Sequence, residues 1–131
     1  MKLDRRTFLL LTLGLAAGCE NPNAAGPGSG LEREVDAGPA VAGAADGVDR
    51  RFRSRGFFLV RRGGRWLAIS SVCTHRKCRL EAEADGTFTC PCHGSTFDPE
   101  GHVTQGPARR DLKLYPVTVD DRGRLRVTVR E

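Results

Sequence analysis

The chain has 131 residues, which is enough for one small domain. Its formal net charge is +5, and basic residues outnumber acidic ones mainly after residue 47. Basic domains often bind nucleic acid, but here the arginines are scattered over expected strands and turns, and few aromatic side chains are available to stack on bases. The sequence therefore predicts no nucleic-acid partner, and its charge favours an acidic partner or a membrane surface.

Residues 1–18 have the pattern of an export signal. A basic start is followed by an apolar run from Phe8 to Ala17. This run is too short to cross a bilayer as a helix and is typical of the central region of a signal peptide. Arg5-Arg6-Thr7-Phe8-Leu9-Leu10 resembles the twin-arginine export motif, which implies a protein exported in a folded, cofactor-loaded state.

The next segment predicts a membrane tether. Leu15-Ala16-Ala17-Gly18-Cys19 resembles a bacterial lipoprotein cleavage box, although its leucine lies one place further upstream than usual. Lipidation of Cys19 would account for the odd fifth cysteine, and we expect the protein on the periplasmic side of a bacterial membrane, with a soluble secreted form as the alternative. Residues 19–30 are rich in Pro, Gly, Ala and Asn and predict a flexible tether, which leaves 31–131 for the folded domain.

The rest of the chain predicts an all-β fold. No segment has helical periodicity, and short apolar or alternating runs are separated by turn residues such as Gly63-Gly64 and Asp85-Gly86. We expect a loop over 37–47. The patterns predict strands at 31–35, 56–61, 66–70, 87–89, 112–119 and 125–129. Short strands with regular turns indicate a small antiparallel β domain.

Four of the five cysteines and two of the three histidines lie in two clusters within 73–98. The first is Cys73-Thr74-His75-Arg76-Lys77-Cys78, and the second is Cys90-Pro91-Cys92-His93-Gly94-Ser95-Thr96-Phe97-Asp98. Thiolate and imidazole are ligands of iron, copper and zinc. The clusters therefore predict two loops that close on one metal centre, and a structural zinc site is the plain alternative.

These clusters follow the pattern C-x-H-x-x-C and C-x-C-H-G-S, which resembles the Rieske iron–sulfur family. The resemblance implies a [2Fe–2S] cluster in which two histidines replace two cysteines on one iron. Carried over by position, the inner iron is held by Cys73 and Cys90 and the outer iron by His75 and His93. Cys78 and Cys92 then form a disulfide between the loops. The family's fold is a small antiparallel β domain with the cluster-binding loops at one tip.

The resemblance also assigns residues around the cluster. It implies that Ser95 donates a hydrogen bond to a bridging sulfide and that Gly106-Pro107 covers the cluster from a third side. High-potential members have a tyrosine where this chain has Phe97, so one hydrogen bond that raises the potential is missing. The family's common Leu-Gly in the first loop is here Arg76-Lys77, which disfavours an apolar quinol pocket and favours an acidic docking surface.

The function implied by the resemblance is one-electron transfer, in an iron–sulfur subunit of the quinol–cytochrome c oxidoreductase type, whose members carry the disulfide pair. The partners would be a cytochrome or a quinol-oxidising complex. A small subunit of a periplasmic molybdenum oxidase, similar to arsenite oxidase, is the alternative. A self-contained oxygenase is excluded because its mononuclear iron needs two further histidines, and only His102 remains. We interpret His102 as a surface residue on a turn.

Overall fold

The computed structural model of the chain describes residues 31–130. The predicted signal (1–18), the tether (19–30) and the lipidation site Cys19 lie outside the described residues. The elements are β1 (Glu32–Pro39), β2 (Gly47–Asp49), η1, a 3₁₀ turn (Arg53–Arg55), β3 (Phe57–Arg62), β4 (Arg65–Ser70), β5 (Glu81–Ala82), β6 (Phe88–Thr89), β7 (Thr96–Phe97), β8 (Val103–Gln105), β9 (Leu114–Tyr115), β10 (Val117–Val119) and β11 (Arg124–Arg130). Within 31–130 no helix is long and apolar enough to cross a membrane.

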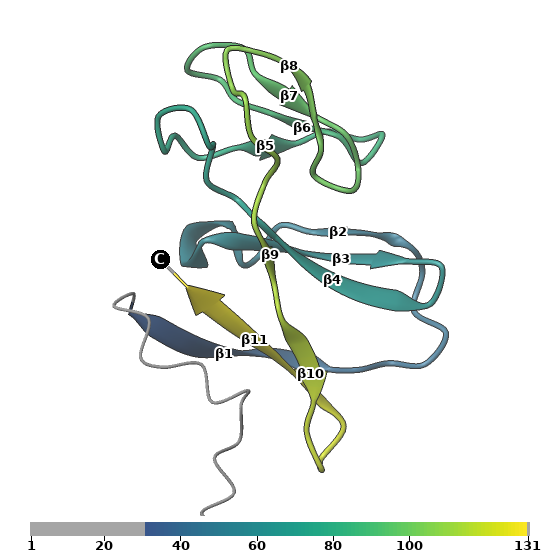
Figure 1. Cartoon of the computed structure of the whole chain (residues 1–131). Coiled ribbons are helices and arrows are strands. Elements are labelled where there is room, and N and C mark those ends of the chain that lie inside the picture. Colours follow the sequence, from purple (N-terminus) through teal and green to yellow (C-terminus); the bar gives the residue numbers. More distant parts are fainter. Residues whose placement is uncertain (1–30, 131) are drawn as a thin grey trace, which may run out of the picture.

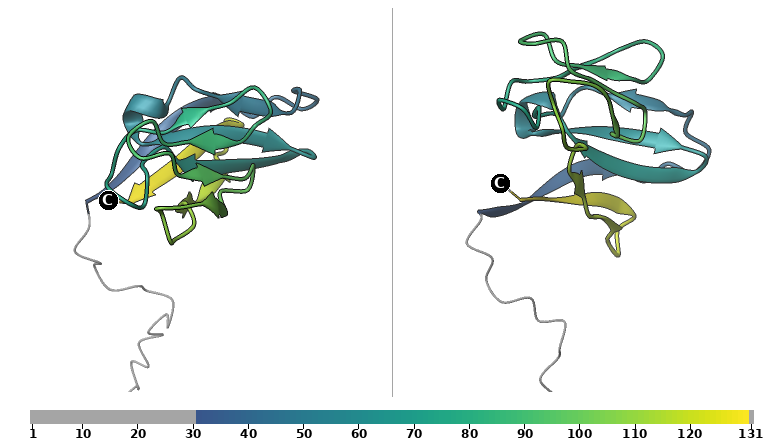
Figure 2. Two further views of the ribbon diagram at one scale, coloured as in Figure 1. Left: turned by 90° about the horizontal axis from the view of Figure 1, so that it is seen from above. Right: turned by 45° about the horizontal axis from the view of Figure 1, so that its top comes forward.

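The strands form three antiparallel sheets, which confirms the predicted all-β fold. Their strand orders are β1-β11-β10, β2-β3-β4-β9 and β5-β6-β7-β8. Figures 1 and 2 show the β5–β8 sheet at one end of the molecule and the turn between β10 and β11 at the other. The chain enters the β5–β8 sheet from β4 and returns from it through β9, so this sheet is an insertion in the larger β structure.

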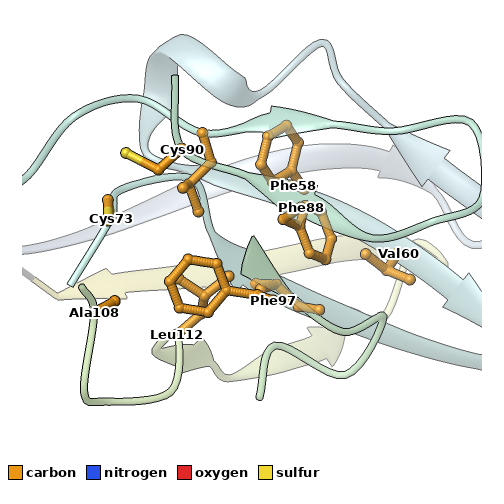
Figure 3. Packing of buried hydrophobic residues seen from close by; sticks show 10 residues of the cluster. Phe58, Val60, Cys73, Phe88, Cys90, Phe97, Ala108 and Leu112 are labelled. Atoms are coloured by element: carbon orange, nitrogen blue, oxygen red, sulfur yellow. The ribbon is translucent and has the colours of Figure 1, made fainter. Parts of the chain in front are cut away.

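The central strand β3 is buried on both faces, because alternate side chains point to opposite sides of a strand. Phe57 and Leu59 pack in one apolar cluster, between β3 and the β1-β11-β10 sheet. Phe58 and Val60 pack in the other, which extends into the β5–β8 sheet (Figure 3). Complete burial of each such side chain stabilises the fold by about 1.5–3 kcal/mol. The second cluster packs against the Cys/His loops and includes their buried residues Cys73 and Cys90.

The predicted loop over 37–47 is wrong at both ends. The first strand continues to Pro39 through a register shift between Asp36 and Gly38, where Asp36 Oδ1 accepts a hydrogen bond from the Gly38 amide at 2.9 Å. Ala37 is buried, which explains why the chain at Ala37 and Gly38 stays in the sheet instead of forming the expected loop. At the other end, Gly47 begins the short strand β2 beside β3.

The predicted strand over 112–119 is also wrong, because it is two strands in different sheets. Pro116 has no amide hydrogen and interrupts the ladder. Before it, β9 pairs with β4, and after it, β10 pairs with β11. The β3–β4 hairpin and the last strand are confirmed, and Gly63 and Gly64 both adopt the positive φ that a two-residue hairpin turn requires.

Candidate metal centre

The two Cys/His loops have the same backbone hydrogen bonds. In the first loop the amide of Cys73 donates to the carbonyl of Cys78 at 2.8 Å, and the amide of Lys77 donates to the carbonyl of Cys73 at 3.0 Å. In the second, Cys90 donates to Ser95 at 2.8 Å and Gly94 donates to Cys90 at 3.0 Å. The loops are therefore structural equivalents, in which Cys73 matches Cys90 and Lys77 matches Gly94.

The equivalent positions 77 and 94 both adopt the left-handed backbone conformation. Gly94 has φ 80° and Lys77 has φ 56°, and Lys77 is the one non-glycine residue with positive φ among residues 31–130. Glycine adopts this conformation without steric cost, whereas a residue with a Cβ does not. The first loop is therefore strained at Lys77, where the second loop is not strained at Gly94.

The four loop cysteines divide into two pairs. Cys78 and Cys92 form a disulfide that joins the loops, with their Cα atoms 6.5 Å apart, so the predicted pairing is present in the structure. Cys73 and Cys90 are free thiols and are 2% and 3% exposed. In Figure 3 they lie with Ala108 at one end of the apolar cluster, and Val60 lies at the other end. Two buried thiols therefore sit where the core meets the tip of the loops.

The two histidines of the loops lie close together and are exposed, as predicted. The ring centroids of His75 and His93 are 5.1 Å apart, and the rings are nearly perpendicular at 86°. The site therefore offers two buried sulfur donors and, further out, two exposed imidazole donors. This set fits a centre in which one metal ion is held by thiolates and its neighbour by imidazoles.

A third segment, 106–110, contacts both loops. The amide of Ala108 donates to Oγ of the buried Ser95 at 3.0 Å. Thr74 Oγ1 donates to the carbonyl of Arg110 at 2.7 Å. Gly106 and Pro107 are exposed next to these contacts, while Phe97 is fully buried in the core under the loops. Sequence reasoning placed this segment over the loops but missed the role of Thr74, because a threonine does not indicate a partner so far along the chain.

The stem of the first loop is fixed to the turn η1 by two arginines, which sequence reasoning also missed. Arg79 Nη1 lies 3.3 Å from both the carbonyl of Arg53 and Oγ of the buried Ser71. In the opposite direction, Arg53 Nε donates to the carbonyl of Leu80 at 2.7 Å. These bonds hold the strand ends on both sides of the loop, so the positions of Cys73 and His75 depend on them.

His102 takes no part in this site. It is exposed, as predicted, and its Nδ1 lies 3.1 Å from Asp98 Oδ2 on the turn that precedes β8. The carboxylate of Asp98 also accepts the amides of Glu100 and His102, so its contacts are those of a tight turn.

A small antiparallel β domain whose disulfide-linked loops present two thiols and two imidazoles is a metal-binding domain of the iron–sulfur class. Residues 31–116 match the protein-family model described as the Rieske [2Fe-2S] domain. Because this match covers more than half of the chain, the chain belongs to the Rieske [2Fe–2S] family, and its cofactor is a [2Fe–2S] cluster that transfers one electron.

Known proteins with similar sequences are iron–sulfur subunits. The cytochrome b6-f complex iron-sulfur subunit of Chlorobaculum tepidum is 32% identical over 102 residues, which are 76% of this chain and 55% of that protein. The putative respiratory nitrate reductase subunit Rieske of Haloferax mediterranei is 45% identical over 65 residues, 48% of this chain and 30% of that protein. The chain thus spans about half or less of the length of these relatives.

A similar solved structure is that of the plasma membrane Rieske protein PetC3 from Synechocystis PCC 6803. Its TM-score is 0.52 at 28% identity, with 72% of this chain and 99% of that chain covered. This likeness agrees with the antiparallel β fold.

Proposed function

We propose that Cys73 and Cys90 bind the inner iron of the [2Fe–2S] cluster and that His75 and His93 bind the outer iron. The observation that carries this proposal is the division of the donors, with both free thiols buried and both imidazoles exposed on equivalent, disulfide-linked loops. The cluster, when bound, accepts and returns one electron. The exposed histidine edges are the shortest route from the site to a partner.

The surrounding residues keep water from the site and adjust its potential. Ser95 Oγ accepts the Ala108 amide, so its own hydrogen is left to donate toward a sulfide. Gly106-Pro107 covers the loops from the third side, on the segment that Ser95 and Thr74 hold in place. Phe97 packs in the core and has no hydroxyl to donate, so we expect a lower potential than a tyrosine there would give.

At the level of the whole protein, we propose an exported electron carrier, tethered to the periplasmic face of a membrane through Cys19, that serves a quinol–cytochrome c oxidoreductase. The relative named as a cytochrome b6-f complex iron-sulfur subunit supports this role. The signal and tether patterns in residues 1–30 support the location. Arg76 and Lys77 in the first loop favour an acidic surface on the partner.

A second candidate is the small Rieske subunit of another oxidoreductase, of the periplasmic molybdenum type. The relative named as a putative respiratory nitrate reductase subunit supports it, because that name places a similar domain outside the quinol–cytochrome complexes. Co-purification of the tagged protein from its native membranes separates the two candidates. Cytochrome subunits would support the first, and a molybdenum-containing subunit would support the second.

The ligand assignment is tested by optical and EPR spectra of the purified protein after dithionite reduction. We expect a brown protein with a rhombic reduced signal of low average g. His75→Ala and His93→Ala should each abolish this signal, whereas His102→Ala should leave it intact. A colourless protein with stoichiometric zinc, after expression with iron and without oxygen, would overturn the electron-transfer role.

A further inference from the structure

Four basic side chains at the tip of the molecule have no ion-pair partner within residues 31–130. They are Arg76, Lys77, Arg109 and Arg110, and all four are exposed. Elsewhere in the described domain six arginines form salt bridges, and others, such as Arg65 and Arg122, form none. The salt-bridged arginines are Arg51, Arg53, Arg62, Arg124, Arg126 and Arg130. The tip segments 73–79, 90–95 and 106–110 contain no Asp or Glu. These three segments therefore carry only basic charge, and the nearest acidic residue in sequence is the exposed Asp111, which follows Arg110.

The contacts of segment 106–110 bring the two basic pairs to the same site. Ala108 is bonded to the second loop through Ser95, and Arg110 is bonded to the first loop through Thr74. Arg109 lies between these two anchors. Arg76 and Lys77 directly follow His75 in the first loop. Basic residues from this loop and from segment 106–110 therefore flank the exposed rings of His75 and His93, the histidine edge.

The backbone at Lys77 indicates that its side chain has a use outside the fold. Its equivalent in the second loop is Gly94, which meets the same left-handed requirement without strain. A residue with a Cβ in that conformation costs about 1–2 kcal/mol. The side chain of Lys77 is exposed and makes no hydrogen bond or ion pair within 31–130, so no side-chain contact in the described domain offsets this cost.

We propose that Arg76, Lys77, Arg109 and Arg110 form a cationic collar that docks an acidic protein, the redox partner, against the histidine edge. The inference rests on the proposed function, because the electron leaves through His75 and His93. An acidic protein is favoured over anionic lipid because the collar surrounds the edge at which the electron is exchanged, and a bilayer there would block the partner. Opposite charge steers association and accelerates it by 10- to 1000-fold at low salt.

The test compares two variants with the same change of net charge. Arg76→Glu/Arg109→Glu reverses one charge on each side of the collar. Arg65→Glu/Arg122→Glu is the matched control, at the β3–β4 hairpin and at the β10–β11 turn opposite the tip (Figure 1). Each protein, loaded with its cluster and reduced, is mixed with an acidic and a basic c-type cytochrome. Both the equilibrium Kd and the rate at which one electron reduces the cytochrome haem are measured.

We expect the collar variant to bind the acidic cytochrome at least tenfold more weakly and to reduce it at least tenfold more slowly at low ionic strength. The difference should shrink at high salt because the charges are screened. The basic cytochrome should gain affinity, and the control variant should change either Kd by less than threefold. Equal effects of the two variants, or no effect, would overturn the collar.

Two further outcomes are read from the same samples. Collar-dependent binding to phosphatidylglycerol vesicles, without a change in cytochrome Kd, would overturn the acidic-protein assignment in favour of lipid. If every variant keeps its reduced EPR signal and the collar variant has an unchanged Kd, the collar proposal is contradicted and the ligand assignment is not. Absence of the signal in the unmodified protein contradicts the proposed function, while the Kd measurements still test the collar.

Discussion

At the residue scale, the left-handed backbone at Lys77 predicts that this residue lowers the stability of the fold while its side chain supports docking of the partner. Lys77→Gly removes the strain of a left-handed residue with a Cβ, and we expect the free energy of unfolding to rise by about 1 kcal/mol. Urea unfolding of the cluster-loaded protein measures this change. Arg76→Gly is the control and should lower the stability slightly, because glycine gains entropy in the unfolded chain. A loss of stability in Lys77→Gly would contradict the strain.

Sequence reasoning predicted the candidate ligands because Cys and His are uncommon residues with distinctive chemistry. The positions of Cys73, Cys90, His75 and His93 follow from a short motif, and the structure brings their loops together. The contact of Thr74 with the Arg110 carbonyl spans 36 residues. A threonine hydroxyl has many available partners, so nothing in the local sequence selects this one.

At the element scale, most of the strands that were predicted are the long ones, although the two-residue β6 lies within the predicted strand at 87–89. The six- and seven-residue strands β3, β4 and β11 show clear apolar patterns. The two- and three-residue strands β2, β5, β7 and β8 are too short for a period to be read. They form because the rest of the fold places each beside a partner strand, β3 for β2 and the neighbouring strands of the β5–β8 sheet for the others. This information lies outside each segment.

The disulfide between the loops predicts a second effect at this scale. Cys78→Ala/Cys92→Ala removes a covalent link between residues that are 14 positions apart in the sequence. In the chain-entropy model this loss lowers the free energy of unfolding by about 3 kcal/mol. We expect earlier unfolding in urea and a cluster that bleaches faster in air, since the loops are no longer held together. The optical spectrum followed over time measures the bleaching. An undiminished cluster lifetime would count against this role.

The turn before β8 predicts a steric effect at Gly101. A Cβ there would lie 3.3 Å from Leu112 Cβ and 3.4 Å from Ile69 Cγ2, and φ is +89°. Gly101→Ala should therefore lower the free energy of unfolding by about 2 kcal/mol, from backbone strain and overpacking together. Gly43→Ala, with φ +79° and no atom within 4 Å, adds the strain alone and should cost about half as much. Equal losses of Tm in Gly101→Ala and Gly43→Ala would show that overpacking at Gly101 contributes nothing.

At the scale of the whole molecule, the two ends of the domain are joined in one sheet. Glu32 in β1 pairs with Arg130 in β11. This pairing forms the base of the domain, and the β2-β3-β4-β9 sheet lies between it and the β5–β8 sheet (Figure 1). No local pattern in the sequence specifies such a contact, because it depends on every turn between the two strands. Five of the nine salt bridges among residues 31–130 also lie here, on β1, β11 and the turn that precedes β11.

The ion pairs of this base predict a defined response to acid. Two hydrogen bonds to Asp36 lower its pKa from 3.8 to about 2. The larger effect comes from the Arg124 side chain and the smaller one from the Gly38 amide. A carboxyl whose pKa is lower in the folded state stabilises the fold above its unfolded pKa. This contribution is therefore complete above about pH 5 and is lost as the pH falls from about 4 to about 2.

Asp36→Asn should consequently be less stable than the unmodified protein at pH 7, and the difference should close as the pH falls from 4 to 2, where both side chains are neutral. Urea unfolding at pH 7, 5 and 3, followed by the fluorescence of Trp66, measures it. Asp121→Asn is the control, because that exposed carboxylate makes no hydrogen bond or ion pair within 31–130. A constant difference between Asp36→Asn and the unmodified protein from pH 7 to pH 3 would show that Asp36 acts through packing. A closing difference would show that its charge holds β1 to β11, and so holds the base of the domain together.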